Sequence, residues 1–119
     1  MSRAVDGSKR KNHRKKILKL AKGYWGRRHS NYKTAKDAVA RALSYAYRDR
    51  KDRKGDFRRL WIIRINAACR EEGLSYSRLI AGLTKAGINI NRKALAALAV
   101  DDPGAFKAVV TRAKAALGA

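Results

Sequence analysis

The sequence predicts an all-α protein, with a long basic helical arm at its N-terminus followed by a small C-terminal domain of about four helices. Three observations support this fold class. The 30 Lys and Arg residues far outnumber the 9 Asp and Glu residues, and most of them precede residue 65. Apolar residues in the second half recur at helical spacing, and helix-capping residues stand between the segments. We place the arm at 1–56 and the domain at 57–119.

The net charge of +21 is distributed unevenly along the chain. Residues 1–64 contain 22 Lys and Arg and 5 Asp, a net charge of +17, whereas residues 65–119 carry +4. Seven of the nine aromatic residues also lie before residue 65. Self-repulsion at this charge density opposes compaction, so we expect an acidic partner, with nucleic acid as the first candidate.

Composition argues against several other classes of protein. No run approaches the roughly 20 apolar residues of a membrane span, and the basic N-terminus lacks the apolar stretch of a secretory signal. The single cysteine, Cys69, cannot form an internal disulfide, which suits a reducing compartment such as the cytoplasm. His13 and His29 have no carboxylate nearby in sequence, and no metal-ligand, Walker or acid–base pattern is present. We therefore expect no enzymatic activity, no cofactor, no metal and no small-molecule substrate.

The arm begins with a candidate helix over 8–22, whose cations fall on all sides. Ile17, Leu18 and Leu20 are scattered around the same wheel, at about 100° per residue. A helix that is polar all round has no apolar face with which to dock. We expect this segment to become ordered only when a polyanion surrounds it.

A turn follows, in which Gly23 and Gly26 bracket the aromatic pair Tyr24 and Trp25. Glycine permits a sharp turn or a close approach of the backbone to a partner. Aromatic rings can stack on unpaired bases, and the arginines that follow can bind phosphate bidentately. The alternative is that both rings pack back on the protein.

Residues 31–54 are predicted to form a long helix with a narrow stripe of small apolar residues. The stripe consists of Ala35, Val39, Ala42 and Ala46. It would permit close approach to another surface but would bury little area. Dense cations mark the end of the helix, where Gly55 weakens it. Either Asp56 caps a new helix, or the first one runs on through Phe57.

The domain is expected to begin with a helix over 57–72 that is the most buried of all. Two adjacent apolar faces give that expectation: Trp61, Ile65 and Ala68 form one, and Leu60, Ile63 and Ala67 the other. Its β-branched run could also form a strand, but the residues that follow favour a helix, and Gly73 supplies its end. Cys69 is interpreted as a small core residue.

Three further helices have clear boundaries. Ser75, Asn91 and Asp102 can each cap a helix N-terminus, Gly87 can follow the first of these helices, and Pro103 can occupy the first position of the last. Their apolar residues, which should form the core, are Leu79, Ile80, Leu83, Leu95, Leu98, Ala99, Phe106, Val109, Val110, Ala113 and Leu117.

Seven blocks, in this order and spacing, carry a resemblance to a known family. They are HRKKILK at 13–19, AKGYWG at 21–26, YAYRDR at 45–50, FRRLWI at 57–62, RINA at 64–67, SYS at 75–77 and NRKALA at 91–96. Each block alone is weakly specific, but together they cover nearly the whole chain. The sequence resembles the family of ribosomal protein number twenty of the bacterial large subunit.

The resemblance implies a structural protein of the large ribosomal subunit that binds 23S-type rRNA early in assembly, beside neighbouring ribosomal proteins. It also implies an arm threaded among RNA helices and an all-α domain that contacts RNA. Some family members bind their own messenger RNA and repress its translation. The residues that face RNA by this resemblance are Lys15, Lys16, Lys19, Lys22, Tyr24, Trp25, Arg48, Arg50, Arg58, Arg59 and Arg64.

Other cations and aromatic residues of the chain complete the candidate RNA-binding set. These are Arg3, Lys9, Arg10, Lys11, His13, Arg14, Arg27, Arg28, Tyr32, Lys33, Tyr45, Lys51, Arg53, Lys54, Trp61, Arg92 and Lys93. If about ten phosphates are contacted, the logarithm of affinity should fall against the logarithm of salt concentration with a slope of about −7 to −9. We expect selectivity to come from RNA shape, with the long helix as a spacer between two binding surfaces.

Rival functions predict different behaviour. A DNA-compacting protein would prefer duplex DNA to folded RNA, and a dedicated messenger repressor would act off the ribosome. A membrane-surface peptide would need an amphipathic face, and an RNA-processing enzyme would need acid–base or metal-binding residues.

Overall fold

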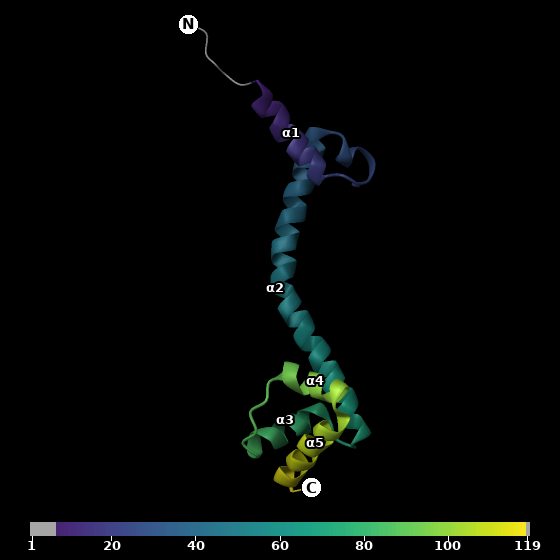
Figure 1. Cartoon of the computed structure of the whole chain (residues 1–119), viewed down its shortest axis with the longest axis vertical. Coiled ribbons are helices and arrows are strands. Elements are labelled where there is room, and N and C mark those ends of the chain that lie inside the picture. Colours follow the sequence, from purple (N-terminus) through teal and green to yellow (C-terminus); the bar gives the residue numbers. More distant parts are fainter. Residues whose placement is uncertain (1–6, 119) are drawn as a thin grey trace. The chain divides into compact units, whose positions relative to one another are not determined.

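The computed structural model describes residues 7–118, so Arg3 of the candidate set lies outside the described residues. The described residues form five α-helices and one 3-10 helix and contain no strand, which confirms the all-α class (Figure 1). The helices are α1 (Ser8–Leu20), η1 (Gly26–His29), α2 (Tyr32–Glu71), α3 (Tyr76–Lys85), α4 (Arg92–Asp101) and α5 (Pro103–Leu117). No helix within 7–118 has the length and apolar character needed to cross a membrane.

The chain divides into two compact units, one up to Lys51 and the other from Asp52 onward. The dividing point lies within α2, so the beginning of this helix belongs to the first unit and its remainder to the second. The predicted boundary between an RNA-binding arm over 1–56 and a domain over 57–119 stays a prediction.

Helix α2 continues through Gly55, which settles the alternative between one helix and two. A glycine in a helix interior costs about 1 kcal/mol relative to alanine, and the Lys, Arg and Leu residues around it have the opposite preference. The helix ends at Glu71. Gly73 then adopts a φ of +75°, and the amide of Leu74 donates a hydrogen bond to the carbonyl of Cys69 at 3.0 Å. This is the left-handed ending that glycine favours after a helix.

All three predicted caps are confirmed. The side chains of Ser75, Asn91 and Asp102 each accept a hydrogen bond from the amide three residues later, at 3.4, 2.8 and 3.1 Å. Pro103 occupies the first position of α5, and Gly87 follows α3 with a φ of +70°. Local capping chemistry therefore defines where the short helices begin.

The second unit contains the larger hydrophobic core, drawn from α2, α3, α4, α5 and the loop before α3. Its buried residues are Ile65, Cys69, Leu74, Leu79, Leu83, Leu95, Ala96, Phe106, Val110 and Ala113. Helices α3 and α5 approach closely at Gly82, where a Cβ atom would lie only 2.6 Å from the carbonyl oxygen of Ala113. A glycine is therefore required at this crossing.

The predicted second apolar face of α2 is not buried. Trp61 and Ile65 do contact the core, but Leu60 is 38% exposed and Ile63 59% exposed. The expectation that this is the most buried helix is therefore wrong. The small domain covers one side of the helix, because three short helices cannot surround it.

The first unit has a small hydrophobic cluster of its own. Ala21, Ala35 and Val39 are buried, and Ile17, Leu18 and Tyr24 pack against them. The prediction that the α1 segment has no apolar side with which to dock is therefore wrong. Small side chains on α2 let neighbouring backbone come close, so two adjacent apolar residues of α1 suffice for a contact.

Candidate nucleic-acid interface

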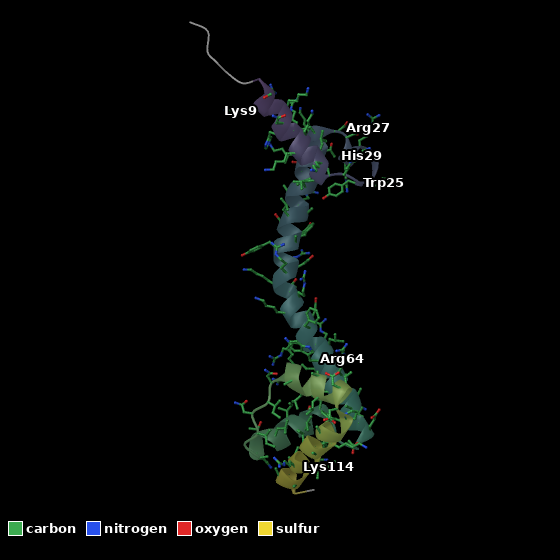
Figure 2. All side chains as sticks on the ribbon, in the orientation of Figure 1. Lys9, Trp25, Arg27, His29, Arg64 and Lys114 are labelled. Carbon is green, nitrogen blue, oxygen red and sulfur yellow. The ribbon has the colours of Figure 1, made fainter. Side chains whose placement is uncertain are left out.

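The first unit presents all of its described cations to solvent. Residues 7–51 contain sixteen Lys and Arg residues, all exposed, against two carboxylates, Asp37 and Asp49, which gives a net charge of +14. Side chains project from α1 in several directions, with Lys9 near its start (Figure 2). Within this range one ion pair forms, between Arg48 and Asp49 at 3.0 Å. The surface therefore carries positive charge that the unit itself does not neutralise.

The loop before α2 separates its two aromatic residues. Gly23 and Gly26 adopt φ values of +88° and +66°, and Nδ1 of His29 donates a hydrogen bond to the carbonyl of Tyr24 at 3.1 Å. Tyr24 is half-buried against the small cluster, whereas Trp25 is 92% exposed. The alternative in which both rings pack on the protein thus holds for the tyrosine and not for the tryptophan.

Several tyrosine rings of the first unit lie beneath cations. The pairs are Arg14 with Tyr32, Arg48 with Tyr45 and Lys51 with Tyr47, at 5.3, 4.6 and 4.5 Å from cation to ring centroid. The edge of His13 also meets the Tyr32 ring, at a centroid distance of 6.4 Å. Such contacts contribute about 0.5–1 kcal/mol at exposed sites. They orient the cations while leaving them accessible to phosphate.

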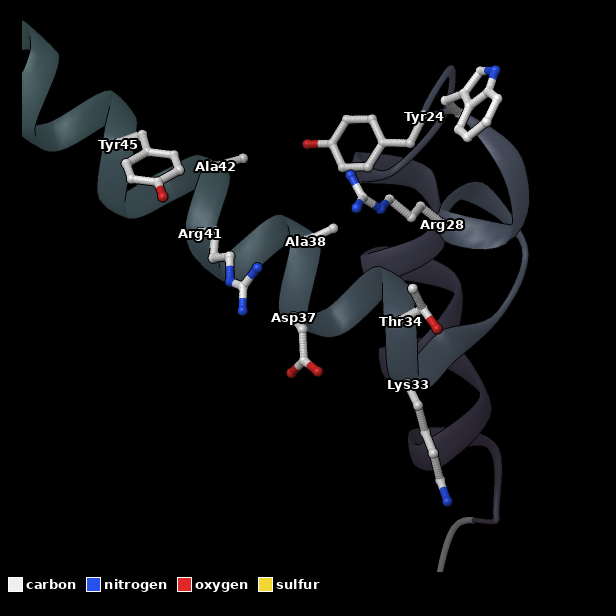
Figure 3. A pocket seen from close by; sticks show the side chains of 10 residues that line it. Tyr24, Arg28, Lys33, Thr34, Asp37, Ala38, Arg41, Ala42 and Tyr45 are labelled. Carbon is white, nitrogen blue, oxygen red and sulfur yellow. The ribbon is translucent and has the colours of Figure 1, made fainter.

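An open hollow of about 660 Å³ lies between this loop and the first turns of α2 (Figure 3). Its cationic and aromatic lining is Tyr24, Trp25, Arg28, Lys33, Arg41 and Tyr45, and the other lining residues are Thr34, Asp37, Ala38 and Ala42. Sequence reasoning had selected most of the first group but missed Arg41. The signal was present, because Lys33, Arg41 and Tyr45 lie on one i, i+4 row of a helix.

The second unit has a smaller basic hollow of about 260 Å³, lined by Arg58, Trp61, Asn91, Arg92 and Lys93. Arg92 is half-buried, and its Nε donates a hydrogen bond to the hydroxyl of Tyr76 at 2.7 Å. Trp61 packs against the core as well as lining the hollow. Structure thus brings together candidates from α2 and α4 that are distant in sequence.

The remaining candidates are exposed along α1, the loop and α2. They are Lys9, Arg10, Lys11, Lys15, Lys16, Lys19, Lys22, Arg27, Arg50, Arg53, Lys54, Arg59 and Arg64. Of these, Arg59 lies 3.9 Å from Asp56, one turn away on the helix. Exposed pairs of this kind contribute little stability and can exchange for a phosphate.

The described residues include no group of three or more His, Cys, Asp or Glu side chains that could hold a metal ion. Cys69 is fully buried, and desolvation raises the pKa of its thiol to about 11. A thiol that stays protonated is a poor nucleophile, so this residue fits the core and not a reactive site.

The amino-acid sequence of this chain matches known proteins over nearly its whole length. The family model described as ribosomal protein L20 covers residues 3–109. The chain belongs to the ribosomal protein L20 family. This confirms the resemblance drawn from the seven sequence blocks. The L20 family consists of ribosomal proteins and not of enzymes, in agreement with the expectation for this chain.

Individual L20 relatives match over most of their length. The large ribosomal subunit protein bL20 of Treponema denticola is 58% identical over 118 residues, which cover 99% of each chain. The protein of the same name from Myxococcus xanthus is 60% identical over 114 residues, 96% of this chain and 99% of the relative. That of Methylobacterium sp. strain 4-46 is 63% identical over 105 residues, 88% of this chain and 84% of the relative.

Proposed function

We propose that the chain binds the 23S-type rRNA of the large ribosomal subunit directly and early in assembly. It would neutralise phosphate charge where RNA helices converge, beside neighbouring ribosomal proteins. The observation that supports this most strongly is the surface of the first unit, where sixteen exposed cations over 7–51 face only two carboxylates. The relatives are named as proteins of the large ribosomal subunit. This favours rRNA over DNA as the polyanion that the chain binds.

Exposed cations are suited to this role because they reach phosphate without first leaving a protein partner. Each phosphate that they neutralise releases condensed counterions, and each contact adds about 0.7–0.9 to the steepness of the salt dependence. Charge of this kind gives affinity without sequence selectivity. We assign most of the affinity to the arm over 1–56.

Selectivity would come from shape, through a second contact by the domain over 57–119. Arg58, Arg92 and Lys93 line one basic hollow in that part of the chain, and the hydrogen bond to Tyr76 holds Arg92 in place. A positioned arginine can match a phosphate arrangement that a mobile one would meet only at an entropic penalty. The domain alone should therefore bind more weakly and more selectively than the arm.

Binding of the chain's own messenger RNA, with repression of its translation, is a further part of the proposal. It is supported by the resemblance and by a basic surface that does not itself distinguish one folded RNA from another. A reporter fused to the messenger leader should fall in expression when the chain is supplied in excess. Unchanged expression would remove this part and leave the rRNA role intact.

The first test is gradient sedimentation of a native lysate at moderate and then high salt, with the chain quantified by mass spectrometry. We expect stoichiometric co-migration with mature large subunits that survives the salt wash. Recovery at the top of the gradient, or together with DNA, would overturn the proposal. In that case a messenger repressor or a nucleoid protein would become the better explanation.

A further inference from the structure

The hollow beside α2 combines features that a positively charged surface alone does not require. Trp25 lies on its lining and is 92% exposed, although a large aromatic ring gains free energy when it is covered. Tyr24 and Tyr45 line the same hollow, one from the loop and one from α2 (Figure 3). Three aromatic side chains therefore border one open space.

We propose that this hollow holds one unpaired RNA base, which lies over Ala38 and Ala42 and stacks on the aromatic lining. The inference rests on the proposed RNA-binding function and adds to it the class of ligand for this particular site. Stacking on aromatic side chains is the usual way in which proteins bind bases that RNA has released from its helices.

The shape of the hollow suits a flat ring. Ala38 and Ala42 occupy successive turns of α2, and their methyl groups point to the side on which Tyr24 lies (Figure 3). Side chains this small let a base approach the helix closely. The volume of about 660 Å³ is within the range of about 300–1,000 Å³ that is typical of small-ligand sites.

The charges around the hollow favour phosphates at its edge. Asp37 also lines the hollow, but its carboxyl group points away from Tyr24 and from the methyl groups of Ala38 and Ala42 (Figure 3). Arg28 and Arg41 are exposed at the same hollow, where they can bind the phosphates on either side of the inserted nucleotide. A fully paired duplex has no free base to offer, because its bases are already stacked.

The site is formed by local backbone structure. Two left-handed glycines and the hydrogen bond from His29 to the carbonyl of Tyr24 shape the loop around the aromatic pair. Packing of Tyr24 against the small cluster anchors one ring, and Trp25 is left free to meet the base. A site that exists before binding loses less entropy when it is filled.

The test compares Trp25→Ala with Tyr47→Ala in the full-length chain. Tyr47 is the matched control, because it is an aromatic residue of the same unit, 57% exposed, and outside the hollow. Each variant is titrated with a 23S-type rRNA transcript, which contains unpaired nucleotides, and with a fully paired RNA duplex. Circular dichroism confirms that both variants retain the helical content of the wild type.

We expect Trp25→Ala to lose affinity for the transcript by about 10- to 100-fold, the effect of removing one stacked base, and to bind the duplex as the wild type does. Tyr47→Ala removes the ring beneath Lys51, so any change in its affinity should be small and the same for both RNAs. In a Trp61→Phe background, which leaves Trp25 as the sole tryptophan, the transcript should quench fluorescence and the duplex should not.

Two results would overturn the base site while leaving the proposed function standing. One is a loss for Trp25→Ala that is equal on transcript and duplex, and the other is no loss on either. Failure of the wild-type chain to bind the transcript would instead overturn the proposed function, and the base site with it. The two failures are therefore distinguishable within one set of titrations.

Discussion

At the scale of single residues, burial controls the chemistry of Cys69. The side chain is fully buried in the core of the second unit, where a thiolate would lose its hydration. That desolvation raises the thiol pKa from the reference value of 9.0 to about 11. Between these two pH values the unfolded chain gives up the proton while the folded chain keeps it, so this residue favours folding less as pH rises through that window.

We therefore expect Cys69 to resist alkylation in the folded chain at pH 8 and to react when urea unfolds the protein. The physical reason is that the thiolate, not the thiol, is the reactive form, and burial suppresses both ionisation and access. Iodoacetamide labelling followed by mass spectrometry measures the rate across a urea series. Labelling of the native chain as fast as a free cysteine peptide would contradict the burial.

Gly82 is the position at which one added carbon should matter most. A Cβ atom there would lie 2.6 Å from the carbonyl oxygen and 2.9 Å from the Cβ of Ala113, so α3 and α5 would have to separate. We expect Gly82→Ala to lower the free energy of unfolding by about 1–3 kcal/mol through overpacking. This exceeds the gain of up to about 1 kcal/mol that alanine brings to a helix. Urea denaturation followed by circular dichroism measures the difference.

Gly55→Ala is the matched control, because the residue lies inside α2 and an added Cβ atom would have no atom within 4 Å apart from the adjacent helix backbone. Relief of the glycine penalty should raise the free energy of unfolding by about 0.5–1 kcal/mol. Equal effects from the two substitutions would show that the α3–α5 crossing is not as close as described.

At the scale of elements, α4 and α5 are joined at a single capping residue. The backbone amide of Asp102 donates to the carbonyl of Leu98 at the end of α4, while its side chain accepts from Ala105 at the start of α5. One residue thus satisfies groups at both helix ends, which would otherwise lack partners.

Asp102→Ala should lower the free energy of unfolding by about 0.5–2 kcal/mol, because the first turn of α5 loses its side-chain acceptor. Asp101→Ala is the control. Asp101 is exposed at the C-terminal end of α4, where a negative charge is unfavourable, so its removal should be neutral or slightly stabilising. Thermal unfolding of the two variants gives the comparison, and equal melting temperatures would contradict a role for the cap.

Features of these helices that depend on residues close together in sequence could be predicted, and features that depend on distant residues could not. Ser75, Asn91 and Asp102 could be identified as caps because a cap involves residues three apart in sequence. Continuity of the helix through Gly55 could not be decided. The glycine disfavours the helix by about 1 kcal/mol, and the helix propensities of its neighbours favour it by a similar total. Exposure of Leu60 and Ile63 could not be foreseen either, because periodicity shows which residues share a face and not whether that face is covered.

Much the same holds for the candidate interface. Its candidate cations within 7–118 are exposed except Arg92, because burial of so many like charges is prohibitive, and their binding to RNA stays a prediction. Tyr24 is half-buried and Trp25 is exposed. This difference depends on the φ values of two glycines and on tertiary packing against the cluster around Ala35. The lining of the hollow lies within 24–45, but the way in which the loop lies against the helix depends on the left-handed backbone at Gly23 and Gly26, which periodicity does not show.

At the scale of the whole molecule, the net charge of +21 predicts how binding responds to salt. Lys15→Gln combined with Lys16→Gln should reduce the steepness of the log–log salt dependence by about 2, because each lysine removes about one phosphate contact. The control replaces Lys85 and Arg112 with Gln, which changes the net charge equally but lies outside the candidate set. A series of titrations from low to high salt measures both slopes, and an equal reduction in the two variants would show that net charge alone matters.

The three-residue core of the first unit has a consequence for how long the protein survives in a cell. Ala21, Ala35 and Val39 bury little apolar area, so in a copy that has found no partner this unit should open more often than the second unit, although its closed form remains the main one. Proteolysis follows the population of such open forms. We expect surplus copies to be degraded from this end first, which would match the supply of the protein to the number of sites awaiting it.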